Sequence, residues 1–224
     1  MAKTGNIKVL IIDNYPLFSL GLSNLIEKTQ KFDIIGTAEN CADALKTAEK
    51  EKPNLVLMEI NLGKENGLEL IPKLKMINPE ITILIISMQD ERFYAERVLR
   101  LGARGYVLKT ESADTIMSAI NTVLDNKVYL SENERDRIFQ AMTEESKLGV
   151  KDWITSIQLL SNRELQVFSF LAKGLGTIEI AARLNLSTKT IDTHKEHIKI
   201  KLQCNSVQEL RQKAIEWSGY ADNL

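Results

Sequence analysis

Several polar residues follow short apolar runs in the first half of the chain, and their types suit the binding of a phosphoryl-like anion. Asp13 and Asn14 follow one such run, and Glu59, Ser87 and Lys109 stand at the ends of three others. A carboxylate can bind a hard cation, whereas a hydroxyl and an ammonium can bind an oxyanion. Polar residues at strand ends also cap helices and neutralise one another, so residue types alone leave both interpretations open.

The apolar runs themselves predict the strands of a parallel sheet. They are short, rich in β-branched residues and almost continuously apolar, which is typical of strands buried on both faces. The runs cover residues 9–12, 34–36, 55–58, 81–86 and 106–108. Apolar residues recur at helical spacing between them, so the chain contains five β-α units and an α/β domain is predicted over residues 5–126. Parallel sheets bind ligands beyond the carboxyl ends of their strands, where the polar residues above should meet.

The second half of the chain lacks strand-like runs and is predicted to be helical. Ser-x-x-Glu patterns begin at Ser131, Ser161 and Ser206, and each is typical of a capping box that opens a helix. Gly174 is placed to end the second of these helices. We expect a partly helical linker over residues 127–154 and an all-α domain of four helices over residues 155–220.

Residues 160–202 predict a helix-turn-helix. A helix over about 162–173 is followed by a short helix over 177–184, a turn over 185–187 and a longer helix over 188–202. Ser187 is placed to cap the longer helix. One face of that helix should pack on the core, and it carries Ile191, His194, Ile198 and Leu202. The opposite face could enter the major groove of DNA, or it could be an ordinary solvated surface.

Composition limits the class of protein. The chain has 224 residues, of which 44% are hydrophobic and 26% charged, as in soluble globular proteins. Lysine plus arginine number 29 and aspartate plus glutamate 30, so any nucleic-acid site must be local. Cys41 and Cys204 lie far apart and form no metal or disulfide pattern, which favours the reducing cytoplasm. No apolar run approaches the roughly 20 residues of a membrane span, so no membrane partner is expected.

Catalytic chemistry is not indicated. The only histidines, His194 and His197, lie far along the chain from the polar strand ends. No Ser-His-Asp or Cys-His arrangement is suggested, so we expect that the protein is not an enzyme.

The strand-end residues and their surroundings resemble the receiver domains of NarL/FixJ-family response regulators. Segments 9–13, 15–18, 54–58 and 102–109 carry the resemblance. It implies a flavodoxin-like doubly wound (βα)5 fold with sheet order 2-1-3-4-5. In that family an aspartate after the third strand accepts a phosphoryl group from a histidine kinase. An acidic pair, that aspartate and a main-chain carbonyl hold Mg²⁺, while a Ser/Thr and a Lys contact the phosphoryl group.

The resemblance assigns roles to individual positions of this chain. Glu59 stands at the acceptor position. The pocket and switch positions are Asp13, Asn14, Ser87, Tyr106 and Lys109, and the metal positions are Asp13, Glu59 and Asn61. Tyr106 matches an aromatic residue that rotates between states in the family, although an aromatic in an apolar strand is more often part of the core.

Two positions depart from the family's pattern. Glu59 replaces the acceptor aspartate, and its extra methylene should misalign in-line attack on a phosphodonor. Asn14 replaces the second acid and should weaken Mg²⁺ binding by removing a formal charge. We therefore expect a receiver that acts independently of phosphorylation, needs no cofactor, binds Mg²⁺ weakly if at all, and has a doubtful histidine kinase partner.

The role of Glu59 is left open by the sequence. Its carboxylate could reach Ser87 and Lys109 and mimic the phosphorylated state, although it supplies about −1 charge against −1.5 to −2 for a phosphoryl group. It could instead form a structural ion pair with Lys109, in a receiver used only for dimerisation or for binding a ligand or partner. A conventional switch with a non-standard acceptor is a further alternative.

Segments 160–164, 171–174, 179–181, 186–191, 193–194 and 201–202 resemble the LuxR-type helix-turn-helix of the same family. The resemblance implies a transcription regulator that binds double-stranded DNA as a homodimer. The base-contacting candidates are Lys189, Thr193 and Glu196, and the backbone-contacting candidates are Thr190, Lys195, Lys199 and Lys201. Glu196 stands where a basic or amide residue is common, and it could accept a hydrogen bond from cytosine or weaken non-specific binding.

Overall fold

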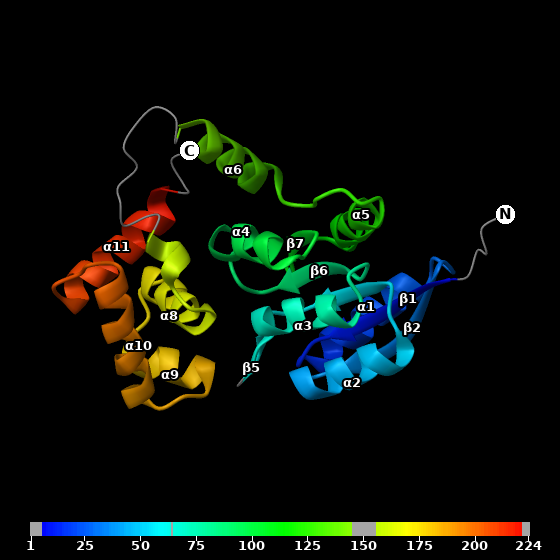
Figure 1. Ribbon diagram of the computed structural model, residues 1–224, viewed down its shortest axis with the longest axis horizontal. Helices are drawn as coiled ribbons and strands as arrows, with labels where there is room; N and C mark the ends of the chain where they lie inside the picture. Colours follow the sequence, from blue (N-terminus) through cyan, green and yellow to red (C-terminus); the bar gives the residue numbers. More distant parts are fainter. Residues whose placement is uncertain (1–5, 64, 145–155, 221–224) are drawn as a thin grey trace. The chain divides into compact units, whose positions relative to one another are not determined.

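The computed structural model describes residues 6–63, 65–144 and 156–220. The chain divides into two compact units, Met1–Ser131 and Glu132–Leu224. Strands and helices alternate in the first unit, whereas the described part of the second unit is helical (Figure 1).

The first unit is built on a five-stranded parallel sheet of order β2-β1-β3-β6-β7. Its strands are β1 (Ile7–Ile12), β2 (Phe32–Ala38), β3 (Leu55–Met58), β6 (Thr82–Ser87) and β7 (Gly105–Leu108). A separate hairpin joins β4 (Asn61–Leu62) to β5 (Glu65–Asn66) after β3. Because this hairpin lies outside the sheet, the observed order equals the predicted order 2-1-3-4-5, and the predicted doubly wound fold is confirmed.

Four helices connect these strands and a fifth follows β7, and together they cover both faces of the sheet. They are α1 (Pro16–Glu27), α2 (Cys41–Glu51), α3 (Leu70–Ile77), α4 (Glu91–Leu101) and α5 (Ala113–Leu124). Side chains of α1 and α5 share one hydrophobic cluster with every second residue of β1 and β3, such as Val9 and Leu57. α3 contacts both α2 and α4, which also pack on the sheet. Strands covered on both faces explain the continuous apolar runs of the sequence.

The segment after α5 extends the sheet beyond β7. The Tyr106 amide donates to the Tyr129 carbonyl over 3.0 Å, and the Tyr129 amide donates to the Arg104 carbonyl over 3.0 Å. A Cβ atom at Gly105 would lie 2.7 Å from the Tyr129 carbonyl oxygen, so glycine is what allows this close approach. The start of the segment expected as a linker is therefore bound to the first unit.

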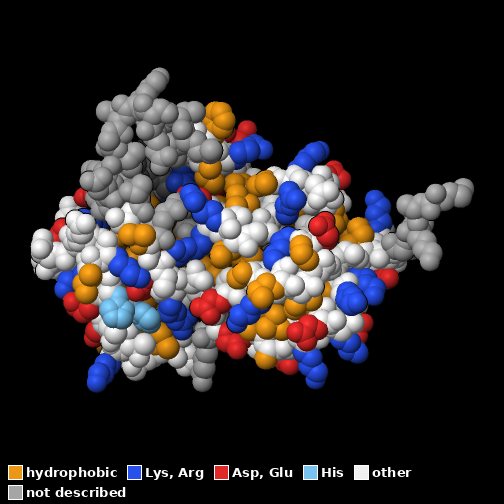
Figure 2. Space-filling model, in the orientation of Figure 1, with side chains coloured by type: hydrophobic (Ala, Val, Ile, Leu, Met, Phe, Trp, Pro, Cys, Tyr) orange, Lys and Arg blue, Asp and Glu red, His pale blue; other side chains and the backbone are white. Residues whose placement is uncertain are grey.

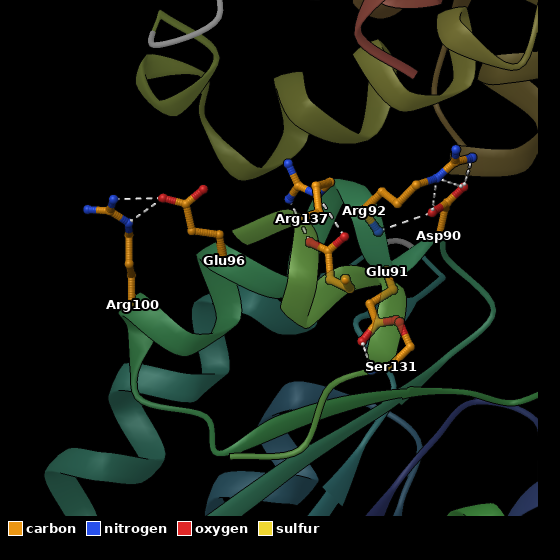
Figure 3. Close-up of polar contacts among 8 residues, drawn as sticks. Asp90, Glu91, Arg92, Glu96, Arg100, Ser131 and Arg137 are labelled. Carbon is orange, nitrogen blue, oxygen red and sulfur yellow. Dashed lines mark hydrogen bonds and ion pairs between the residues drawn. The ribbon is translucent and has the colours of Figure 1, made fainter. Parts of the chain in front are cut away.

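Polar contacts fix the N-terminal end of helix α4, as Figure 3 shows. Asp90 caps its N-terminus by accepting from the Arg92 amide, and the Asp90 carboxylate also pairs with the Arg92 guanidinium at 2.8 Å (Figure 3). The Ser131 amide donates to the buried Glu91 carboxylate over 3.0 Å (Figure 3). Gly102 ends the helix with a φ of 108°. The contact with Glu91 holds the last residue of the first unit against α4.

The second unit contains α6 (Glu132–Glu144) and a bundle of four further helices, as predicted. The bundle comprises α8 (Asn162–Ala172), α9 (Thr177–Leu184), α10 (Thr188–Lys201) and α11 (Val207–Tyr220), preceded by the short 3-10 helix η2 (Ile157–Leu159). The capping box of Ser161 and Glu164 and the left-handed Gly174, with a φ of 79°, are both confirmed. Residues 145–154 of the expected linker lie outside the described residues. Among the helices that the structure describes, none has the length and apolarity needed to span a membrane.

Candidate functional site

The parallel sheet brings the polar strand-end residues of the first unit together. Met58 of β3 is the register partner of both Ile12 of β1 and Ile85 of β6, so the carboxyl ends of the central strands are level. Asp13, Glu59 and Lys109 come directly after three of these strands, and Ser87 is the last residue of β6. The four side chains consequently share one buried pocket at this edge of the sheet.

One oxygen of the Glu59 carboxylate is surrounded by hydrogen-bond donors. Glu59 Oε1 accepts from the Ile60 amide at 2.7 Å, from the Asn61 amide at 3.0 Å and from Ser87 Oγ at 2.5 Å. The first two donors belong to the backbone that follows Glu59 itself. The side chain therefore folds back over its own backbone toward the end of β6.

The other oxygen of Glu59 is also engaged. Glu59 Oε2 accepts from the Met88 amide at 3.2 Å and lies 3.1 Å from Lys109 Nζ. The side chain of Glu59 is 2% exposed and that of Lys109 4% exposed. Both oxygens of Glu59 are thus bonded to donors that the chain itself supplies. The sequence pointed to Ser87 and Lys109 but carried no signal for the backbone amides.

Lys109 joins Glu59 to the second buried acid. Its ammonium lies 2.5 Å from Asp13 Oδ2, while Asp13 Oδ1 accepts from the Tyr15 amide at 2.9 Å. The rings of Tyr15 and Phe18 lie 4.8 and 4.5 Å from the ammonium and add cation–π attraction. Burial raises the pKa of the Asp13 carboxyl, and the hydrogen bond from Lys109 acts against that increase.

The oxygen ligands that these side chains offer do not fit a tight Mg²⁺ site. A single ammonium contacts both Asp13 and Glu59, so each carboxylate already has a cationic partner within the protein, and one of the two negative charges is offset. The side-chain oxygens of Asn14 and Asn61 are buried without a hydrogen-bond partner, but they are neutral. Among the described residues no three acidic, histidine or cysteine side chains cluster as metal ligands would. A hard divalent cation is held most tightly by several carboxylates.

Tyr106 is linked to the same pocket through the backbone after β6. Its side chain is fully buried, and its hydroxyl donates to the Gln89 carbonyl at 2.8 Å. The Gln89 amide in turn donates to Ser87 Oγ at 3.1 Å. Burial raises the pKa of the Tyr106 hydroxyl well above its usual value, so it remains a neutral donor. Glu59, Ser87, Gln89 and Tyr106 thus form a continuous chain of contacts.

In the second unit, α9 and α10 form the predicted helix-turn-helix. Asn185 adopts a left-handed conformation with a φ of 53° in the turn, and Ser187 caps α10 by accepting from the Thr190 amide at 3.0 Å. Ile191 and Ile198 are fully buried beneath α10. Lys189 and Thr193 are exposed on its opposite face, as the sequence predicts.

Three lysines that the sequence assigned to the DNA backbone are held by other side chains of the same unit. Lys199 Nζ pairs with Glu196 Oε2 at 2.9 Å, and Lys201 Nζ pairs with Glu164 Oε2 at 2.6 Å. Lys195 is only 4% exposed, and its ammonium bonds to the hydroxyl of Thr177 at the start of α9. That hydroxyl lies 18 positions from Lys195 in the sequence, so helical periodicity alone could not detect the contact.

Charges of both signs lie on the surface around these helices. Lysine or arginine and aspartate or glutamate side chains are interspersed over the face that Figure 2 shows, and histidine is visible among them (Figure 2). On α10, Asp192 and Glu196 accompany Lys189 on the exposed side. The formal charge of this helix face is therefore close to balanced.

Comparisons with known proteins assign a family to each unit. Residues 9–121 match the family described as the response regulator receiver domain. Residues 158–214 match the family described as bacterial regulatory proteins, luxR family. The first match covers the pocket around Glu59, and the second covers the helix-turn-helix.

Curated relatives match almost the whole chain. The chain is 35% identical over 206 residues to the positive transcription regulator BvgA of Bordetella pertussis, covering 91% of this chain and 94% of the relative. It is 31% identical over 210 residues to the oxygen regulatory protein NreC of Staphylococcus aureus, covering 93% and 97%. Both similarities extend through both units in the same order.

Solved structures share the fold. An RcsB–DNA complex has a TM-score of 0.56 and 22% identity, covering 95% of this chain and 99% of that one. RcsB from Salmonella enterica serovar Typhimurium, bound to promoter P1flhDC with the phosphomimetic BeF3-, has a TM-score of 0.59 and 21% identity, covering 98% and 100%. At these identities the likeness establishes the fold.

Proposed function

The chain belongs to the NarL/FixJ family of response regulators, and we propose that its receiver domain acts without being phosphorylated. The protein is a DNA-binding transcription regulator with a receiver domain and a LuxR-type helix-turn-helix, and its relatives are regulators and not enzymes. What distinguishes this chain within the family is the pocket around Glu59. The proposal concerns how that pocket sets the activity of the DNA-binding half.

The observation that carries the proposal is the saturation of the Glu59 carboxylate. Its two oxygens contact the amides of Ile60, Asn61 and Met88, the hydroxyl of Ser87 and the ammonium of Lys109. A nucleophile must face the donor phosphorus in line, with its lone pairs free. A carboxylate held on all sides by the protein's own donors is poorly placed for such an attack.

The same contacts support the role of Glu59 as a built-in mimic of a phosphoryl group. Ser87 and Lys109 occupy the positions that contact the phosphoryl group in the family, and here both contact Glu59. In one RcsB structure a phosphomimetic, BeF3-, accompanies promoter DNA. We propose that Glu59 supplies the equivalent charge from within the chain. Ser87 and Tyr106 are then held continuously in one arrangement through the Gln89 backbone.

This function implies a particular set of partners. The regulator binds double-stranded DNA as a homodimer, with half-sites separated by roughly one helical turn. No histidine kinase is needed, because the switch position already carries its charge. Mg²⁺ is not required either, since Lys109 already gives both Asp13 and Glu59 a cationic partner.

DNA binding with and without a phosphodonor tests the proposal. The purified full-length protein is first used to select binding sites from a pool of duplexes, and its affinity for the selected site is then measured with and without acetyl phosphate and Mg²⁺. We expect equal affinity under both conditions and no phosphoryl adduct by intact mass. Glu59→Gln keeps the shape of the side chain but removes its charge, and it should weaken dimerisation and DNA binding about tenfold or more, the effect of losing a buried charge-assisted contact.

A double variant supplies the positive control for phosphorylation. Glu59→Asp combined with Asn14→Asp restores the family's acids at both departing positions, and this variant should gain a phosphoryl adduct and a donor-dependent increase in DNA affinity. Donor-dependent activation of the unaltered protein would instead support a conventional switch. Unchanged dimerisation and DNA binding in Glu59→Gln would mean that the Glu59 charge is inert, as a structural ion pair would be.

A further inference from the structure

Two carboxylates stand on the exposed face of α10, and each has a lysine directly behind it. The side chains of Asp192 and Glu196 are 63% and 59% exposed, whereas those of their partners Lys195 and Lys199 are 5% and 18% exposed. We infer that Asp192 and Glu196 read base edges in the major groove and that Lys195 and Lys199 position them. The inference rests on the proposed binding of DNA through α10, and it names the chemistry of the target.

Lys199 holds Glu196 by both oxygens. The ammonium lies 2.9 Å from Oε2 and 3.2 Å from Oε1, one helical turn toward the C-terminus. Each carboxylate oxygen has two lone pairs, so the side facing solvent can still accept hydrogen bonds. The ion pair therefore restricts the rotamer of Glu196 without using up its acceptor capacity.

Asp192 is anchored to the neighbouring helix of the motif. Its Oδ1 lies 3.5 Å from the ammonium of Lys195 and 3.5 Å from the hydroxyl of Thr177, which also bonds to Lys195. Thr177 begins α9, so this network ties the two helices of the motif together behind the exposed carboxylate. With 4% of its surface exposed, Lys195 faces this network and not the groove.

Carboxylates accept hydrogen bonds and cannot donate them, which restricts the bases they can contact. In the major groove the hydrogen-bond donors are the amino groups of cytosine N4 and adenine N6, and adenine presents an acceptor beside its donor. Guanine and thymine present acceptors that would repel a carboxylate. The four-residue spacing of Asp192 and Glu196 corresponds to about 6 Å along α10, or roughly two base-pair steps.

The same carboxylates lower the affinity for other DNA. Phosphates repel them, so duplexes that offer no amino group in the correct place gain little from contact with α10. A site with two correctly placed cytosines compensates for this repulsion through direct hydrogen bonds. The acidic pair therefore increases discrimination, while Lys189 on the same face supplies attraction.

A selection experiment tests the inference on the full-length protein. The wild type, Glu196→Gln, Asp192→Asn and the control Asp136→Asn are each used to enrich sites from duplexes with a randomised core. Asp136 is exposed on α6, outside the helix-turn-helix, and its replacement removes the same charge. In each half-site the wild-type motif should hold cytosine at two positions about two steps apart. Glu196→Gln should lose cytosine preference at one of them by about tenfold and accept adenine there, since glutamine pairs with adenine.

Salt dependence separates positioning from phosphate contact. Lys199→Gln should reduce the cytosine preference at the Glu196 position while leaving the slope of log K against log salt unchanged. A fall in that slope of about 0.9 per protomer, or roughly 1.8 for the homodimer, would mean that Lys199 neutralises a phosphate, which would overturn its positioning role.

The remaining outcomes are also distinct. Tryptophan fluorescence first checks that Glu196→Gln and Asp192→Asn are folded. If both folded variants then select the wild-type motif, base reading by the carboxylates is overturned, while the proposed DNA binding through α10 is not. A motif change in Asp136→Asn equal to that in Glu196→Gln would overturn it as well, because bulk charge would explain both. Failure of the wild type to enrich any motif would overturn the proposed DNA reading by α10 itself.

Discussion

Two carboxylate–lysine pairs of almost equal length occupy opposite environments in this protein. Glu59 and Lys109 lie 3.1 Å apart in the receiver pocket, with 2% and 4% of their side chains exposed. Glu196 and Lys199 lie 2.9 Å apart on α10, with 59% and 18% exposed. The distance is thus nearly constant, while solvent access differs greatly.

The difference teaches that burial, and not distance, decides what such a pair can do. Buried charges interact strongly because little water screens them, and removing one partner leaves the other charge uncompensated. An exposed pair contributes little to stability because water screens its charges. The pocket pair is therefore suited to fixing one conformation. The α10 pair, in contrast, can replace part of its contacts with water by contacts with DNA.

The largest expected effect comes from breaking the buried pair. Lys109→Met keeps the length of the side chain but leaves Asp13 and Glu59 without their shared cation. We expect the receiver domain to lose about 3–5 kcal/mol of stability. Both tryptophans of the chain lie in its second half, at Trp153 and Trp217, so hydrogen exchange of peptides from β1 and β3 is the suitable measurement.

Lowering the pH should partly rescue this variant. The pKa of Asp13 is already raised by burial in the native protein, and loss of Lys109 removes the contact that opposes the increase. Protonation of Asp13 then removes an uncompensated charge, so the deficit shrinks as the pH falls. A deficit below about 1 kcal/mol, typical of an exposed pair, would show that burial does not strengthen this interaction.

An intermediate effect on stability is expected for Glu164, because its pair with Lys201 is less buried than the Glu59–Lys109 pair and more buried than the Glu196–Lys199 pair. Its carboxylate is 5% exposed and Lys201 35% exposed, and it also accepts from the Ser161 amide at 2.6 Å. Glu164→Gln should destabilise the DNA-binding domain by about 1–2 kcal/mol through loss of the charged cap. Trp217, whose ring centroid lies 5.9 Å from that of Phe168 on α8, reports the unfolding by fluorescence.

Glu164 also gives a pH dependence of known sign. Burial raises the pKa of the Glu164 carboxyl, but hydrogen bonds from Lys201 and Ser161 outweigh the effect of burial. They hold the pKa of Glu164 below 4.5. Its contribution is therefore fully present above about pH 4.5 and disappears as the pH falls through the lower, folded-state pKa. This acid sensitivity should be absent in Glu164→Gln, and its persistence would assign it to another group.

The smallest effect is expected for the exposed pair. Lys199→Gln should change the stability of the DNA-binding domain by less than about 0.5 kcal/mol, because solvent screens the charges and both side chains regain rotamer freedom. Chemical denaturation followed by tryptophan fluorescence measures this. A loss above about 2 kcal/mol would mean that Lys199 stabilises the fold substantially. The exposed pair and the buried pair of Lys109 would then not differ as proposed.

Much of the fold could be predicted from the sequence because it depends on local patterns. The apolar runs of β1 and β3 and the capping residues Ser161 and Ser187 act over a few neighbouring positions, and all are found where the sequence indicates. The extension of the sheet beside β7 was missed. It depends on Gly105 lying against Tyr129, and that approach exists only after α5 has folded back.

The candidate site was predicted in its residue types but not in its bonding. The sequence indicated that Asp13, Glu59 and Lys109 should meet, since parallel strands end at one edge of a sheet. It could not indicate that the amides of Ile60 and Met88 complete the shell around Glu59, because every residue except proline carries an amide. Nor could it show that Lys195 points into the protein toward Thr177.

By itself, the sequence determined the two families, the order of the elements and the replacement of the acceptor aspartate by Glu59. Each of these features depends only on residue types and on short spacings along the chain. The tertiary structure alone decided which charges are buried, which lysines are already paired and how completely Glu59 is bonded. The physical reason is that the strength of a charge pair depends on the solvent around it. Solvent exclusion is produced by segments that are distant in the sequence, so it appears only when the chain is folded.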